Sequence, residues 1–228
     1  MTLEIAEKEE KKWDNYWTKR KNLSQSVYRN IASLYRTFII KNALNFFIEK
    51  EFKKGSKLLH AGSGGGQVDK DLVKKFDIVA LDISSQALKL YKINNGEKAS
   101  IIQASIFAIP QKTGTFDGIY NLGVHEHFSK QENEKIFREF SRVLKSNGKI
   151  VLFWPPKYGF SVIFLNTLHF ILNDLLGKNI RLHPEEISLI ESKNQVNEIL
   201  KNAGFKLVEY YFGPKDLFTH VILVAKKV

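Results

Sequence analysis

The stretch Lys57–Asp82, KLLHAGSGGGQVDKDLVKKFDIVALD, decides the fold of this chain. It holds two short apolar runs, Leu58–Ala61 and Ile78–Leu81, and a glycine-rich turn, Gly62–Gly66, between them. The order predicts a strand, a tight turn, a helix over about Gln67–Lys75 and a second strand. It therefore indicates an α/β unit with two parallel strands.

A nucleoside-binding site is predicted by the glycine-rich turn together with the end of the second strand. Glycines allow positive φ and let a ligand lie directly on the backbone. Asp82, at the tip of the second strand, can accept hydrogen bonds from a ribose diol. A dinucleotide fingerprint, G-x-G-x-x-G, would need glycine where the chain has Gln67, so a nicotinamide oxidoreductase is disfavoured. A glycine-rich loop without special function is the plainer alternative.

The pattern resembles motif I of class I S-adenosylmethionine-dependent methyltransferases, of the type 11-like group. Gly62, Gly64 and Gly66 match its G-x-G-x-G, while His60 stands where an acid is common. The run RVLKSNGK, residues 142–149, resembles a further segment of that family. The resemblance implies a Rossmann-like α/β fold with helices on both faces of a seven-stranded, mostly parallel sheet. Its strand order is 3-2-1-4-5-7-6, with the last strand antiparallel.

The resemblance also implies the cofactor, S-adenosyl-L-methionine, whose product is S-adenosyl-L-homocysteine. Ser105 takes the place of an acid that meets the adenine amino group in the family, and Ile106 would line the adenine face. The residues expected to bind the cofactor are Gly62, Ser63, Gly64, Gly66, Gln67, Asp82, Ile83, Ser105, Ile106 and Asn121.

The rest of the chain fits one domain of 228 residues. An amphipathic helix is expected over residues 27–52, and Trp13, Tyr16 and Trp17 share one face of an earlier helix. Capping boxes begin at Ser129 and Ser192, and a hairpin of strands 205–211 and 218–225 ends the chain. The expected parts are a helical cap (1–55), a cofactor-binding core (56–154), an acceptor-side insert (155–191) and a C-terminal helix and hairpin (192–228).

Composition removes several functional classes. The chain has no cysteine, which excludes disulfides, thiolate metal sites and cysteine nucleophiles. The charged start is unlike a secretory signal, and no stretch is long and apolar enough to span a bilayer, so a cytoplasmic location is expected. The net charge of +11 comes from lysines mixed with acids, which favours a solvated surface over a nucleic-acid site.

His125-Glu126-His127 is the candidate for acid–base chemistry. The segment follows the fourth strand, where the acceptor should approach the methyl group. Histidine ordinarily titrates near neutral pH, so His125 or His127 could serve as a general base. A satisfied loop histidine is the alternative for either residue. A metal is not expected, because no further ligand stands at convincing spacing.

The sequence favours a small-molecule or lipid-like methyl acceptor. Asn121-Leu122-Gly123-Val124 replaces the D/N-P-P-Y/F/W motif of enzymes that methylate amino groups of DNA bases. The apolar insert suggests a greasy acceptor or peripheral membrane contact, although it would equally suit a helix buried on the core. An RNA methyltransferase and a non-catalytic cofactor-binding subunit remain alternatives.

Overall fold

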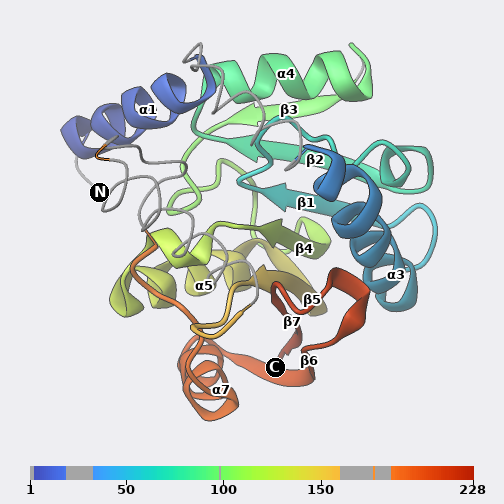
Figure 1. Cartoon of the computed structure of the whole chain (residues 1–228), viewed down its shortest axis with the longest axis vertical. Helices are drawn as coiled ribbons and strands as arrows, with labels where there is room; N and C mark the ends of the chain where they lie inside the picture. The colour runs from blue at the N-terminus through green and yellow to red at the C-terminus, as the bar shows by residue number, and fades with distance from the viewer. Residues whose placement is uncertain (1–2, 19–32, 98, 160–176, 178–185) are drawn as a thin grey trace.

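The computed structural model describes residues 3–18, 33–97, 99–159, 177 and 186–228, which form one sheet covered by helices (Figure 1). Its seven strands lie in the order β3-β2-β1-β4-β5-β7-β6. They are β1 (Lys57–Ala61), β2 (Asp77–Asp82), β3 (Ser100–Gln103), β4 (Phe116–Leu122), β5 (Leu144–Trp154), β6 (Phe205–Tyr211) and β7 (Val221–Lys227). Neighbouring strands are parallel except at β7, which runs antiparallel to β5 and β6. The predicted fold class and strand order are confirmed.

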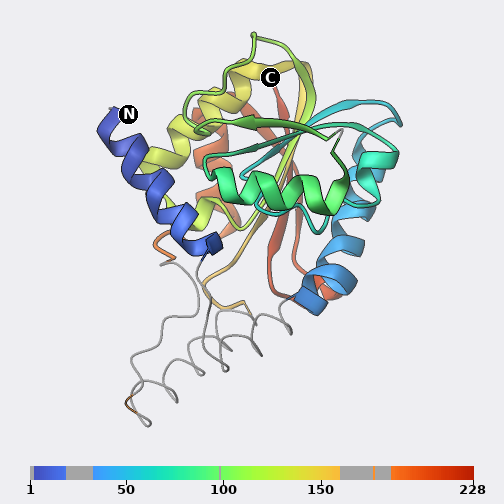
Figure 2. The ribbon, with the colours of Figure 1, turned by 90° about the horizontal axis from the view of Figure 1, so that it is seen from above.

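Helices cover both faces of this sheet. The α-helices are α1 (Leu3–Thr18), α3 (Lys41–Glu51), α4 (Ser85–Asn95), α5 (Lys130–Val143) and α7 (Lys193–Asn202). The short turns are the π-helical η1 (Arg36–Ile40) and the 3-10 turns η2 (Leu72–Lys74), η3 (His125–His127) and η5 (Pro214–Asp216). Figure 2 shows α3 and α5 on opposite sides of the sheet. No helix within the described ranges combines the length and the apolar character needed to cross a bilayer.

Alternation along the strands builds two buried layers. On β5, Leu152 and Trp154 point into a layer that also takes the apolar faces of α5 and α7. Phe153 points the other way, where it meets Phe47 of α3 with ring centroids 6.5 Å apart. Because both faces are covered, the central strands are apolar throughout rather than alternating.

Serine caps fix where the helices begin. Ser84 Oγ accepts the N–H of Ala87 at the start of α4, and Ser129 forms a reciprocal capping box with Glu132 at the start of α5. Ser192 caps α7 in the same way, but the side chain of Gln195 accepts the N–H of Glu191 instead of that of Ser192. The predicted capping box at Ser129 is therefore confirmed. Of the capping box predicted at Ser192, only the hydrogen bond to the serine side chain is confirmed.

The predicted helix over Gln67–Lys75 is wrong. Only the 3-10 turn η2 forms there, and the backbone before it is held by a four-residue turn, closed by a hydrogen bond of 3.1 Å from Asp69 N–H to the Gly66 carbonyl. The Asp69 carboxylate is fully buried and hydrogen-bonded beneath the glycine turn. This tertiary anchor overrides the helical pattern of a short segment.

Two other boundaries also differ from prediction. The described part of the helix expected over residues 27–52 starts at residue 33 and contains the π turn η1 before α3. The last strand begins at Val221 rather than residue 218, because Leu217 and Phe218 both adopt left-handed backbone with φ of 58°. Such residues cannot continue an extended strand. Most of the predicted insert, 160–176 and 178–185, lies outside the described residues.

Candidate active site

The glycine turn follows β1 at the carboxyl edge of the sheet. Gly62, Gly64 and Gly66 all have positive φ, of 71°, 52° and 63°, which side chains rarely tolerate. The N–H groups of Gly62 and Ser63 both donate to the carbonyl of Leu81 on β2, at 2.7 and 2.9 Å. The turn thus wraps over the end of the neighbouring strand, as the sequence predicts.

Asp82 ends β2 directly beside this turn. Its Oδ2 accepts the N–H of Gly64 at 2.8 Å, and its Oδ1 accepts the N–H of Ser84 at 2.9 Å. Burial raises the pKa of this carboxyl, while the two backbone donors oppose the shift. Each carboxylate oxygen has a further lone pair available for a ligand. The acid is therefore placed where it can both hold the glycine turn and accept hydrogen bonds from hydroxyl groups.

A buried polar network that the sequence did not predict lies beneath the turn. His60 Nδ1 and the Tyr91 hydroxyl both meet Asp69 Oδ2 at 2.7 Å. A Cβ atom at Gly66 would lie 2.3 Å from the Tyr91 ring, so the tyrosine rests directly on the turn. Asp69, from beyond the turn, thus joins β1 to α4 through His60 and Tyr91.

Helix α4 also holds the turn from outside. Asn94 donates to the carbonyl of Gly65 at 2.6 Å, and Asn95 donates to that of Gly66 at 2.9 Å. With Tyr91 these residues form one face of α4, separated by three and four positions. That spacing is the only signal in the sequence that could have indicated their common role.

The residues expected around adenine come together at the same edge. Ala104 N–H donates to the Asp82 carbonyl at 3.1 Å, which ties the end of β3 to the end of β2. Ile83 is half-buried and Ile106 is buried in the adjoining apolar layer. Ser105 Oγ accepts the N–H of Phe107 at 3.2 Å, so this hydroxyl caps its own turn.

Gln67 and Ser63 occupy different positions relative to the turn. Gln67 is exposed, and its amide lies 3.5 Å from Ser33 Oγ of the N-terminal helical region. Ser63 is buried within the turn itself. Ser63 is therefore enclosed by the turn, whereas the side chain of Gln67 faces outward beside it.

His125 is enclosed in the protein interior. It is 0% exposed, its Nε2 accepts from Asn121 Nδ2 at 2.9 Å, and its Nδ1 lies 2.6 Å from Asn133 Oδ1. The ring stacks on Phe137 with centroids 4.5 Å apart. Burial lowers the pKa of His125 to about 4. Both ring nitrogens are occupied, which favours the satisfied loop histidine, and Asn121 turns its amide toward His125.

Glu126 and His127 differ from His125 in their surroundings. Burial raises the pKa of Glu126 to about 8, and its Oε2 has no hydrogen-bond partner among the described residues. The backbone carbonyl of Glu126 accepts the N–H groups of Ile187 and Ser188. His127 Nε2 lies 3.9 Å from Glu126 Oε1, and its side chain is partly exposed. Within the described part of the chain, no three acidic or histidine side chains converge as a metal ion would require.

Comparison with known proteins finds a methyltransferase domain in the middle of the chain. A family model for the methyltransferase domain matches residues 59–152. No curated protein matches the sequence. Three similar solved structures are a methyltransferase dependent on S-adenosylmethionine (SAM) from Methanosarcina mazei, the magnesium protoporphyrin IX methyltransferase of Synechocystis with bound S-adenosylhomocysteine (SAH), and a TehB-like SAM-dependent methyltransferase from Corynebacterium glutamicum.

The structural likeness extends over most of each chain. For the Methanosarcina protein the identity is 16%, the TM-score is 0.61, and 80% of this chain and 97% of that chain are covered. For the Synechocystis enzyme the identity is 16% and the TM-score 0.62, with 92% of this chain and 90% of that chain covered. For the Corynebacterium protein the identity is 17% and the TM-score 0.62, with 89% of this chain and 95% of that chain covered. This chain therefore has the fold of class I methyltransferases, and its residues 59–152 match a methyltransferase domain.

The residues at the strand ends fit this cofactor. Three glycines with positive φ give a backbone cradle, and the Asp82 carboxylate lies beside it with lone pairs available for a ribose diol. Bound there, S-adenosylmethionine supplies a methyl group on a sulfonium, which is intrinsically reactive toward a nucleophile. The protein has to place an acceptor behind that methyl group.

Proposed function

We propose that this enzyme transfers the methyl group to a small-molecule or lipid-like acceptor. The observation that carries the cofactor side of the proposal is the Asp82–Gly64 hydrogen bond, because it joins the ribose-binding acid to the turn that would hold the methionine end. Asp82 would bind the ribose, and Ile83, Ser105 and Ile106 would enclose the adenine. The remaining contacts would come from Gly62, Ser63, Gly64, Gly66, Gln67 and Asn121.

Alignment is the main task left to the protein. Holding an acceptor in line with the methyl group can supply several kcal/mol of the barrier. His125 is proposed as a positioning residue, because its two asparagine partners fix the loop after β4. His127 and Glu126 are proposed as the groups that take a proton from the acceptor. Glu126 suits this role because a carboxyl with pKa about 8 changes charge near neutral pH.

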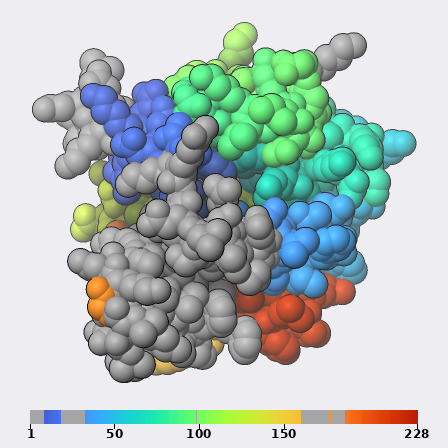
Figure 3. Space-filling model, turned by 45° about the horizontal axis from the view of Figure 1, so that its top comes forward, coloured from blue at the N-terminus to red at the C-terminus, as the bar shows by residue number. Residues whose placement is uncertain are grey.

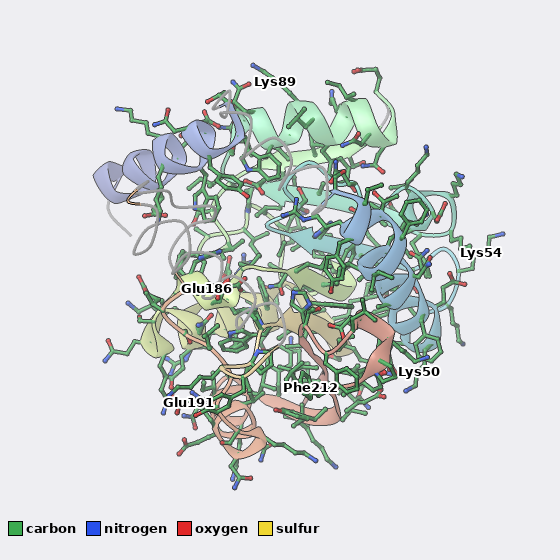
Figure 4. All side chains as sticks on the ribbon, in the orientation of Figure 1. Lys50, Lys54, Lys89, Glu186, Glu191 and Phe212 are labelled. Carbon is green, nitrogen blue, oxygen red and sulfur yellow. The ribbon has the colours of Figure 1, made fainter. Side chains whose placement is uncertain are left out.

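The distribution of charge supports a small or apolar acceptor over RNA. Lys50, Lys75 and Lys145 pair with acidic residues at distances of 2.6–2.7 Å. Because their positive charges are already paired, these lysines would attract the phosphates of a nucleic acid less strongly. Figure 4 shows Lys89 by α4, away from Lys50 and Lys54 on the α3 side of the molecule. A dedicated polyanion site is therefore disfavoured.

Exposed apolar side chains support a lipid-like acceptor or contact with a membrane surface. Phe212, Leu217 and Phe218 are 44–51% exposed on the connection between β6 and β7. That connection lies at the edge where β5 ends, because Trp154 pairs with Val221. The Synechocystis enzyme, which has a similar fold, is named for magnesium protoporphyrin IX. Apolar side chains at the acceptor edge suit a ligand of this kind.

A labelled-methyl experiment tests the proposed function. The enzyme is incubated with methyl-labelled S-adenosylmethionine and cell extract, and the extract is separated into small metabolites, lipids, RNA and protein. Label in the metabolite or lipid fraction supports the proposal, and label in RNA would support the RNA alternative. Tight cofactor binding with no transfer to any fraction would indicate a non-catalytic subunit, and a preference for a nicotinamide dinucleotide would contradict the cofactor assignment.

A further inference from the structure

Helix α1 touches the end of β3 and the three loops that follow β2, β1 and β4 at the candidate cofactor site. Glu10, Trp13, Asp14 and Trp17 follow the spacing i, i+3, i+4 and i+7, which places them on one helical face. This face meets the last residue of β3, Gln103, and residues that follow β2, β1 and β4. Figure 3 shows α1 packed beside α4 at the surface of the molecule.

Asp14 fastens α1 to the start of α4. Its Oδ1 accepts from Ser84 Oγ at 2.5 Å and from Gln86 N–H at 3.3 Å, and its Oδ2 lies 3.4 Å from Ser85 Oγ. A carboxylate is favoured there by the positive end of the α4 dipole. Glu10 adds a hydrogen bond to Gln103, at the end of β3, at 2.9 Å.

The two tryptophans cover the remaining loops. A Cβ atom at Gly64 would lie 2.8 Å from the Trp17 ring, and one at Gly65 would lie 3.7 Å from it, so the indole rests on the glycine turn. Trp13 meets His127 edge to face, with ring centroids 5.3 Å apart. The indoles of α1 therefore face the backbone cradle at one end and the candidate proton acceptor at the other.

We propose that α1 is a wall of the cofactor site, in which Trp17 contacts the bound cofactor and Asp14 holds the helix in place. This inference rests on the proposed cofactor site at Gly62–Gly66 and Asp82. An aromatic face beside the turn offers a large apolar contact and attracts the positive charges of S-adenosylmethionine. Because α1 covers the strand ends where the cofactor would lie, it would slow release of both cofactor and product.

Titration calorimetry with S-adenosylhomocysteine tests the role of Trp17. Trp17→Ala should weaken binding at least tenfold, Trp17→Phe should stay within about threefold of the wild type, and Asp14→Ala should weaken binding severalfold. Asn15→Ala, an exposed position on the same helix, is the matched control and should bind like the wild type. Unchanged or tighter binding by Trp17→Ala would overturn the proposal.

Hydrogen exchange on the unmodified enzyme gives a test that needs no variant to fold. Adding S-adenosylhomocysteine should slow exchange of the α1 amides, residues 3–18, together with those of the glycine turn. Protection of the turn without protection of α1 would overturn the inference while leaving the proposed function intact. Failure of the wild type to bind the ligand at all would overturn both.

Discussion

Asp82 Oδ2 accepts the N–H of Gly64 at 2.8 Å, so the acid at the end of β2 holds the middle of the glycine turn that follows β1. The same turn is held from below by Tyr91 and from outside by Asn94 and Asn95. A cofactor would therefore meet a preorganised cradle rather than a loose loop, and the cost of ordering it is met during folding.

Gly66 should tolerate alanine poorly. Its φ is +63° and a Cβ atom would lie 2.3 Å from the Tyr91 ring, so Gly66→Ala should lower the free energy of unfolding by roughly 2 to 4 kcal/mol. Gly114→Ala is the control, because its φ of +71° carries similar strain but no atom lies within 4 Å. It should lose about 1 kcal/mol. Urea denaturation measures both, and equal losses would show that Tyr91 does not confine the turn.

The buried network beneath the turn should depend on Asp69. In Asp69→Asn, one of the two groups that meet Oδ2, His60 or Tyr91, loses a good acceptor, which should cost about 1 to 3 kcal/mol of stability. Asp71→Asn, which removes surface pairs with Lys41 and Lys74, should change stability by less than about 1 kcal/mol. If thermal unfolding finds the two variants equally stable, the network does not support the turn.

Stability should respond to pH through His125 and Glu126 in opposite directions. His125 has its pKa lowered to about 4, so between pH 6.5 and 4 protons bind mainly to the unfolded chain and stability falls as the pH falls, by roughly 3 kcal/mol in all. Glu126 has its pKa raised to about 8, so the folded state holds its proton more tightly. Stability therefore falls as pH rises from about 4.5 to 8.

Single variants separate the effects of His125 and Glu126 on the pH dependence of stability. The stability of Glu126→Gln relative to the wild type should rise steadily between pH 4.5 and 8 and then level off. His125→Gln should lose the acid sensitivity of the wild type between pH 6.5 and 4. Urea denaturation at half-unit pH steps measures both, and curves that stay parallel to the wild type would show that neither group titrates as its burial implies.

His127 should affect turnover more than binding. Once an acceptor is known, His127→Ala should reduce kcat by roughly a hundredfold if the imidazole takes a proton. Cofactor affinity should stay within a few-fold of the wild type. A wild-type kcat in His127→Ala, together with a loss in Glu126→Gln, would transfer the role to Glu126, and full activity in both would leave alignment alone as the mechanism.

The sheet was predictable because local signals agreed with each other. The runs at 58–61 and 78–81, the serine at 84 and the capping box at 129 each specify an element by themselves, and the structure contains all of them. The sequence could not show that the helix over residues 67–75 would fail to form, because the groups that anchor Asp69 lie on β1 and α4, at a distance along the chain. Long-range anchors of this kind leave no periodic pattern.

The sequence predicted the candidate site only for residues that directly follow or end a strand. Gly64 and Asp82 stand beside each other as their positions in the sequence indicate. The α1 contacts could not be foreseen, because the spacing of Trp13, Tyr16 and Trp17 indicates a shared face but not what that face covers. The surroundings of His125 were likewise hidden, since its partners Asn121 and Asn133 lie on different elements.

Titration calorimetry of S-adenosylhomocysteine binding to the wild type and to Asp82→Ala tests the central claim most directly. The account predicts one site per chain and a loss of roughly 2 to 4 kcal/mol of binding free energy in the variant, because a charged hydrogen-bond acceptor is removed from the ribose. Asp77→Ala, at the exposed start of the same strand, should bind like the wild type. Equal affinity of the Asp82→Ala variant and the wild type would contradict the assignment of the site.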